Sequence, residues 1–116
     1  MLDWQAVKTD RQLVASIDWE MTPKEAFESY QLRAKDNWRQ RDLKPVVYFY
    51  LSTWQGRNRV LLVRRDYLHS EELAQAPAPP ELVQACATAG EGQGYPRGQL
   101  PLDEPLRRWL QKELGA

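Results

Sequence analysis

The clearest pattern along the chain is a pair of strand-like segments near its centre. Residues 46–54 and 59–67 are rich in β-branched and aromatic side chains, and residues 55–58 (Gln-Gly-Arg-Asn) lie between them. A glycine at the first central position is typical of a type II′ turn, whose twist matches that of paired strands. The sequence therefore predicts an antiparallel β-hairpin in which Ser52 pairs with Leu61.

The period of two along a strand divides this hairpin into two unlike faces. One face is apolar and typical of a protein core; it carries Val47, Phe49, Leu51, Thr53, Val60 and Leu62. The other is aromatic and basic; it carries Tyr48, Tyr50, Ser52, Trp54, Arg59, Leu61, Val63 and Arg65. A loop of two or four residues gives this division, whereas a loop of three residues would invert it.

Apolar residues at spacings of three and four predict amphipathic helices on both sides of the hairpin. A capping box at residues 22–25 begins a helix that ends near residue 41. After the hairpin, Ser70 is expected to cap a short helix through Ala76. Pro80 begins a second helix over residues 81–89, which Gly90 ends, and a final helix follows Asp103.

Residues 12–19 allow two interpretations. Alternation of apolar and polar side chains predicts a half-buried strand, while Leu13, Val14 and Ile17 also fit a helix. We favour the strand, because a lone two-stranded ribbon is marginally stable. The fold class predicted is thus α+β, with a β-hairpin, a third strand from residues 12–19 on that interpretation, and three to four amphipathic helices packed against them. We expect one domain over residues 1–116 and a mobile loop over residues 90–101, which hold four Gly and two Pro.

The charge of the chain is unevenly distributed, although its net value is zero. Residues 33–65 hold nine basic and two acidic side chains, whereas residues 66–116 hold four basic and eight acidic ones. The fold either pairs this basic block internally or displays it. The acidic side chains near enough in sequence to pair with it are Glu20, Glu25, Glu28, Glu71 and Glu72.

Little in the sequence points to catalysis or to a bound metal or cofactor. One Cys and one His cannot supply the ligands of a structural zinc site, and no acidic cluster has the spacing of a cation loop. His69 is expected at a loop-to-helix junction, which is usually solvated, and Cys86 lies in an alanine-rich helix, where a thiol packs as a small hydrophobe. The glycine-rich residues 90–94 follow a helix, whereas phosphate-binding loops follow a strand. The acidic pairs at residues 71–72 and 103–104 fit the first turns of helices. We therefore predict no catalytic residues, no metal site and no cofactor.

The leading functional hypothesis is a non-enzymatic protein–protein interaction or accessory module, with a homodimer as one version. It rests on the many aromatic residues and on strand 46–54, which has no charge to protect an edge. The candidate binding residues are those of the aromatic, basic face and its turn: Tyr48, Tyr50, Trp54, Arg57, Arg59 and Arg65. The alternatives are a nucleic-acid or polyanion binder that uses the same face, and a small enzyme whose site the sequence does not reveal.

A cytoplasmic location is expected, without membrane association. The longest nearly apolar run, residues 46–51, is far too short to cross a bilayer, and the N-terminus lacks the pattern of a signal peptide. A single cysteine excludes an intrachain disulfide, so nothing points to an oxidising compartment.

Overall fold

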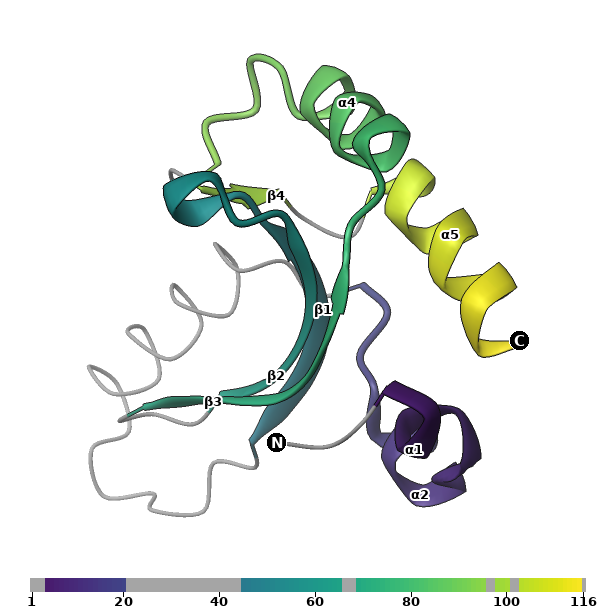
Figure 1. Ribbon diagram of the computed structural model, residues 1–116. Helices are drawn as coiled ribbons and strands as arrows, with labels where there is room; N and C mark the ends of the chain where they lie inside the picture. The colour runs from purple at the N-terminus through teal and green to yellow at the C-terminus, as the bar shows by residue number, and fades with distance from the viewer. Residues whose placement is uncertain (1–3, 21–44, 66–68, 96–97, 101–102, 116) are drawn as a thin grey trace.

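The computed structural model describes residues 4–20, 45–65, 69–95, 98–100 and 103–115. Within these residues, an antiparallel sheet with the strand order β3-β2-β1-β4 occupies the centre of the molecule (Figure 1). Its strands are β1 (Val46–Ser52), β2 (Arg59–Arg65), β3 (Ser70–Pro77) and β4 (Gln99–Leu100). Together with the helices described below, this sheet confirms the predicted α+β fold. The predicted helix over residues 22–41 lies outside the described residues.

The β1–β2 hairpin is confirmed, but its predicted register is wrong by two residues. Ser52 pairs with Arg59 instead of Leu61. The connection is longer than a two-residue turn, because Trp54–Gly56 form a short 3₁₀ turn in which Gln55 has a φ of 54°. A shift by two residues preserves the side-chain alternation, so the predicted division into two faces is correct.

Strand β3 corrects the helix that was predicted from Ser70 to Ala76. It pairs antiparallel with β2 along its length, with one irregularity between Leu62 and Val63. The Glu, Leu and Ala side chains of this segment are good helix formers in isolation, but backbone pairing with β2 overrides that preference. The acidic pair Glu71 and Glu72 consequently lies in a strand, opposite Arg64 and Val63, and not at the start of a helix.

The N-terminal segment forms two short helices, α1 (Trp4–Thr9) and α2 (Arg11–Ser16). The strand interpretation of residues 12–19 is therefore wrong over α2. Asp10 caps this helix, since its side chain accepts a hydrogen bond from the Leu13 amide at 3.0 Å. Only Ile17 contacts the sheet as a strand residue would, through a parallel bridge to Val47.

The two C-terminal helices, α4 (Pro80–Ala89) and α5 (Glu104–Leu114), confirm the predictions for this region. Helix α4 begins at Pro80 and is capped by Gly90, while Asp103 precedes α5. Strand β4 falls inside the predicted loop 90–101, which is thus partly regular. The mobility of that loop stays a prediction.

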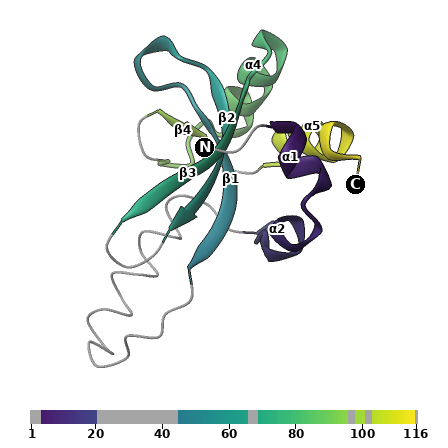
Figure 2. The ribbon, with the colours of Figure 1, turned by 60° about the horizontal axis from the view of Figure 1, so that its bottom comes forward.

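The main core lies between the apolar face of the sheet and the helices, which Figures 1 and 2 show on one side of it. Phe49 is fully buried at its centre, and its ring lies 6.0 Å from that of Trp4 and 5.6 Å from that of Trp19. The fully buried Leu106 and Leu110 bring α5 into the same cluster. None of the helices in the described ranges is long and apolar enough to cross a membrane.

Candidate functional site

The aromatic, basic face divides into a buried part and an open part. Tyr48 is only 3% exposed and packs with Leu61 and Val63, so it belongs to a second small core. The Tyr50 ring stacks on it at 6.1 Å and is half-buried. Trp54 is 56% exposed, and it is the only large hydrophobic side chain so exposed in the described part of the chain.

Three of the predicted binding residues meet around one small hollow, which we call the tip hollow. Tyr50, Trp54 and Arg59 line it, and its volume is about 160 Å³. The remaining described lining residues are Ser52, Leu61, Glu72, Gly98 and Gln99. The structure thus joins residues of β1, the turn and β2 to Glu72 of β3 and to Gly98 beside β4. Sequence reasoning missed Gly98 and Gln99 because they are far from the hairpin in the chain.

Arg59 is held in place by two side chains of β3. Its Nη1 donates to Gln75 Oε1 at 2.7 Å and lies 3.7 Å from Glu72 Oε2. Its buried Nε has no hydrogen-bond partner among the described residues. A partly exposed pair of this kind stabilises a fold by at most about 1 kcal/mol, so its main effect is to fix the guanidinium at the hollow.

The Tyr50 hydroxyl stays neutral in this setting. Burial raises its pKa above the ordinary value of 10.0, and the Glu72 carboxylate raises the pKa further, while Arg59 acts in the opposite direction. A phenol of this kind is a hydrogen-bond donor at neutral pH. The tip hollow therefore presents donors from Tyr50 and Arg59 beside the carboxylate of Glu72.

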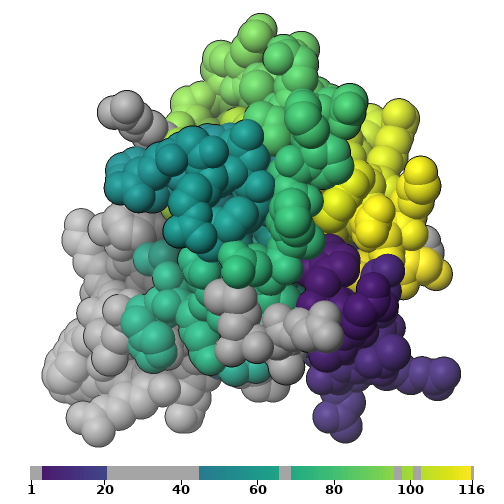
Figure 3. Space-filling view, viewed as in Figure 1, coloured from purple at the N-terminus to yellow at the C-terminus, as the bar shows by residue number. Residues whose placement is uncertain are grey.

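We call residues 53–58 the hairpin tip; this segment, teal in Figure 3, lies open at the surface. Its backbone is nevertheless fixed. The Thr53 amide donates to the Gly98 carbonyl at 3.0 Å, and the Arg57 amide donates to the Trp54 carbonyl at 3.1 Å. Gly98 also supports the indole, since a Cβ there would lie 3.1 Å from Trp54 Cε3. The tip thus combines a fixed backbone with an exposed aromatic ring.

The other three predicted residues do not line the tip hollow; Tyr48 is the buried one described above. Arg57 belongs to the hairpin tip and is exposed, with no ion pair to any described residue. Arg65 is at the opposite end of β2, where it lies opposite Val46 of β1 and Ser70 of β3 in the sheet. The candidate set predicted from the sequence is thus one cluster of three residues, one exposed neighbour and two residues outside the cluster.

The basic block of residues 33–65 was expected either to be paired within the fold or to be displayed at the surface. Two of its described arginines are paired within the fold. Arg59 lies beside Glu72, and Arg64 lies 3.6 Å from Glu71. The other predicted acidic partners behave differently: Glu20 pairs with Arg107 at 3.2 Å, and residues 25 and 28 lie outside the described ranges.

Strand β1 is an interior strand over part of its length. Strand β4 pairs with Leu51 and Ser52, and the Asp18 amide donates to the Val47 carbonyl at 2.7 Å. Alternate residues of a strand direct their backbone N–H and C=O groups to the same edge. Of the residues that face the edge away from β2, Phe49 lies between the contacts of Val47 and Leu51, and it alone has no described backbone partner there. This edge therefore gives little support to association by strand addition.

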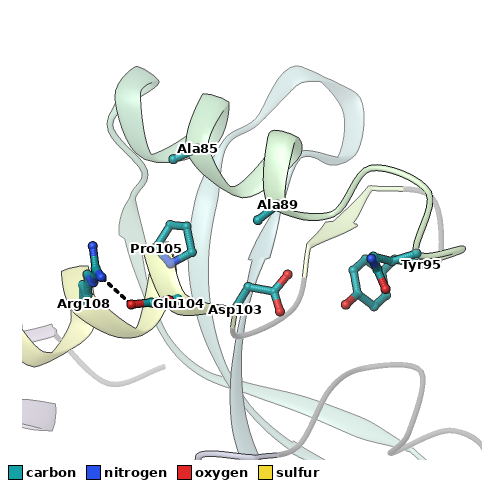
Figure 4. Close-up of a pocket in the computed structure, with 8 residues that line it drawn as sticks. Ala85, Ala89, Tyr95, Asp103, Glu104, Pro105 and Arg108 are labelled. Carbon is teal, nitrogen blue, oxygen red and sulfur yellow. Dashed lines mark hydrogen bonds and ion pairs between the residues drawn. The ribbon is translucent and has the colours of Figure 1, made fainter.

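A second, larger hollow lies between α4 and α5, and we call it the α4–α5 hollow (Figure 4). Its volume is about 650 Å³, and Ala85, Ala89 and Pro105 form its apolar wall. Tyr95 stands at one end, and the ion pair between Glu104 and Arg108 lies at the other. No sequence motif announces this site, because helix α4, a loop and helix α5 each contribute part of it.

The Asp103 carboxylate points into the α4–α5 hollow in Figure 4. It makes no side-chain hydrogen bond as a cap of α5, and no ion pair to it is formed by a described residue. Burial raises its pKa above the ordinary 3.8, while Arg107 partly opposes this shift. Asp103 is thus a partly buried carboxylate without an ion pair to a described residue.

Cys86 and His69, which the sequence analysis considered as catalytic candidates, differ in burial. Cys86 is 1% exposed, and burial, with a smaller contribution from Asp103, raises its pKa to about 11. This confirms the predicted packing role, because a thiol in that state is a poor nucleophile. His69 is exposed. Within the described ranges, no three His, Cys, Asp or Glu side chains are grouped so that they could hold a metal ion.

Comparisons with known proteins add no assignment. No protein-family model matches the chain, and the searches found no curated protein and no solved structure similar to it. Its function is therefore inferred from the surfaces described above.

Proposed function

We propose that this protein is a non-enzymatic protein-interaction module that contacts its partner through the hairpin tip and the adjoining tip hollow. The observation that carries the proposal is the exposure of Trp54, at 56%, on a backbone held by Gly98. Tryptophan, tyrosine and arginine are the residues most enriched among those that dominate binding energy at interfaces. Trp54, Tyr50 and Arg59 supply all three types around one hollow.

The fixed backbone of the hairpin tip supports the same proposal. Ordering a loop on binding costs free energy, and a loop that is already ordered avoids this cost. The hydrogen bonds from Thr53 to Gly98 and from Arg57 to Trp54 hold the tip before any partner arrives. A partner would then gain the burial of the indole ring, one of the largest apolar contributions a side chain makes.

The contacts of the basic residues lead us to prefer a protein partner over a nucleic acid. Stacking of bases needs open aromatic faces, but Tyr48 is buried and Tyr50 half-buried. Binding of phosphates needs unpaired cations, but Arg59 and Arg64 lie beside Glu72 and Glu71. Of the six candidate binding residues, Trp54 and Arg57 are the exposed ones.

The experiment is site-specific photo-crosslinking in cells of the source organism. A benzophenone amino acid is placed at position 54 and, as a control, at the exposed position 111 on α5. We expect a defined protein adduct from position 54, none from position 111, and a weaker adduct when Arg57→Glu is added. Adducts that are mainly nucleic acid would favour the alternative function. Equal labelling from both positions would show that the hairpin tip binds nothing specific.

A further inference from the structure

Two surfaces of this protein complement each other, and they lie on different parts of the molecule. The hairpin tip offers an exposed indole and an exposed guanidinium, while the α4–α5 hollow offers an apolar wall and a carboxylate (Figure 4). Trp54 does not line the α4–α5 hollow of its own chain. We infer that the partner of the hairpin tip is a second copy of this chain, whose α4–α5 hollow receives Trp54 and Arg57. This inference rests on the proposed function and identifies its partner.

The size and lining of the hollow suit an indole ring. It is an open hollow, and its volume of about 650 Å³ leaves room for an indole ring and a neighbouring side chain. The small side chains of Ala85, Ala89 and Pro105 leave that space open, and Tyr95 provides an aromatic ring at its end. Aromatic pairs attract one another edge to face or offset, so Tyr95 can contact an entering indole productively.

The charges that remain available on the two surfaces are opposite. Arg57 has no ion pair to a described residue, and Asp103 has none either. The charge of Glu104 is already balanced by Arg108, so Asp103 supplies the negative charge of the hollow. Arg57 follows Trp54 within one turn, since its amide donates to the Trp54 carbonyl. A guanidinium would therefore enter beside the indole and meet a carboxylate that forms no ion pair with a described residue.

Charge on the two surfaces favours the same orientation. The net charge is zero, so two copies do not repel one another overall. Arg57 is the one charged side chain of the hairpin tip, residues 53–58, and the hollow holds Asp103, with which no described residue forms an ion pair. Complementary potentials of this kind orient partners and suppress wrong encounters. Because tip and hollow are different surfaces, each contact leaves one of each free, and association continues beyond a dimer unless a ring closes.

The experiment uses two variants that each remove one surface. Trp54→Ser removes the indole of the tip, and Ala85→Arg fills the hollow from an exposed helical position. Sedimentation velocity of the wild type should show a mass that rises with concentration. Each variant alone should sediment as a monomer, with association weakened at least tenfold. Their equimolar mixture should form a one-to-one dimer and nothing larger, because only one intact tip and one intact hollow remain.

Controls separate this inference from a loss of folding and from the proposed function. Gln111→Arg adds the same charge elsewhere on the exposed face of α5 and should associate like the wild type. Should Ala85→Arg melt far below the wild type, Asp103→Asn replaces it and should weaken association and its dependence on salt. A wild type that stays monomeric, or a mixture that does not dimerise, overturns the inference. If position 54 still crosslinks to a different protein, the proposed function stands with another partner.

Discussion

Replacing Gly98 with alanine tests the support of Trp54 directly. Gly98 has a φ of 78°, in the left-handed region, and an added Cβ would lie 3.1 Å from Trp54 Cε3 and 3.5 Å from the Trp54 backbone. The left-handed conformation costs a residue with a Cβ about 1–2 kcal/mol, partly offset by about 0.4–1 kcal/mol from the less flexible unfolded chain. We expect a loss of about 1 kcal/mol in the free energy of unfolding, equivalent to a fall of roughly 4 °C in Tm. The contact at 3.1 Å must also move the indole by a few tenths of an ångström.

Gly92→Ala is the matched control for this change. Gly92 has a nearly equal φ of 73°, but nothing lies within 4 Å of its added Cβ. Both variants should therefore lose similar stability in urea unfolding, while only Gly98→Ala should shift the indole N–H resonance of Trp54 in a ¹H–¹⁵N spectrum. An unmoved Trp54 resonance in Gly98→Ala would refute the contact on which the fixed hairpin tip depends. A full loss of folding in Gly98→Ala alone would show that Trp54 cannot give way, contrary to its exposure.

Three further changes test the core and the α4–α5 hollow. With a pKa of about 11 instead of the ordinary 9.0, Cys86 holds about a hundredfold less thiolate at pH 8. A thiol reagent should therefore react far more slowly with the folded protein than with the protein unfolded in urea. Equal rates would contradict the burial of Cys86. Leu110→Ala should cost about 2–5 kcal/mol, because Leu110 is fully buried, and the half-buried Leu114→Ala should cost less in the same urea titration. Since burial raises the pKa of Asp103 in the folded state, deprotonation weakens folding as the pH rises above about 4. Asp103→Asn should thus gain thermal stability relative to the wild type at pH 7 and lose that advantage at pH 3, and a larger advantage at pH 3 would reverse the sign.

The two faces of the hairpin could be predicted from the sequence, but its register could not. Side-chain alternation has a period of two in any strand, so the segregation of Phe49 from Tyr50 follows from the sequence alone. The register depends on the connection, and a glycine at position 56 suggested a tight turn. In the actual connection Gln55 has a φ of 54°. Residues other than glycine rarely adopt a positive φ, so nothing in the sequence predicts it at this glutamine.

The wrong predictions at residues 70–76 and 12–19 have different physical causes. Local preference favoured a helix in the first segment and a strand in the second. In the first, the segment pairs its backbone with β2. A helix beginning at Ser70 would have left the edge of β2 without these hydrogen bonds. In the second, the Asp10 cap and the helical spacing of its apolar residues prevailed, and only Ile17 joins the sheet. The first outcome depends on contacts between distant residues, which a single sequence does not display. The second depends on a local cap, which the alternation of apolar and polar side chains outweighed in the prediction.

The exposure of Trp54, on which the proposed function rests, follows from the same connection that shifted the register. A tight turn would have placed Trp54 in the ladder opposite Arg59, among the other side chains of the aromatic face. In the structure, Ser52 takes that position and β1 ends there, so Trp54 enters the 3₁₀ turn beyond the last paired residue. There Gly98, from a segment more than forty residues away, supports its ring without covering it. The sequence thus identified Trp54 as a candidate binding residue, but only the hairpin tip and its contact with Gly98 explain why this side chain is displayed while Tyr48, on the same face, is buried.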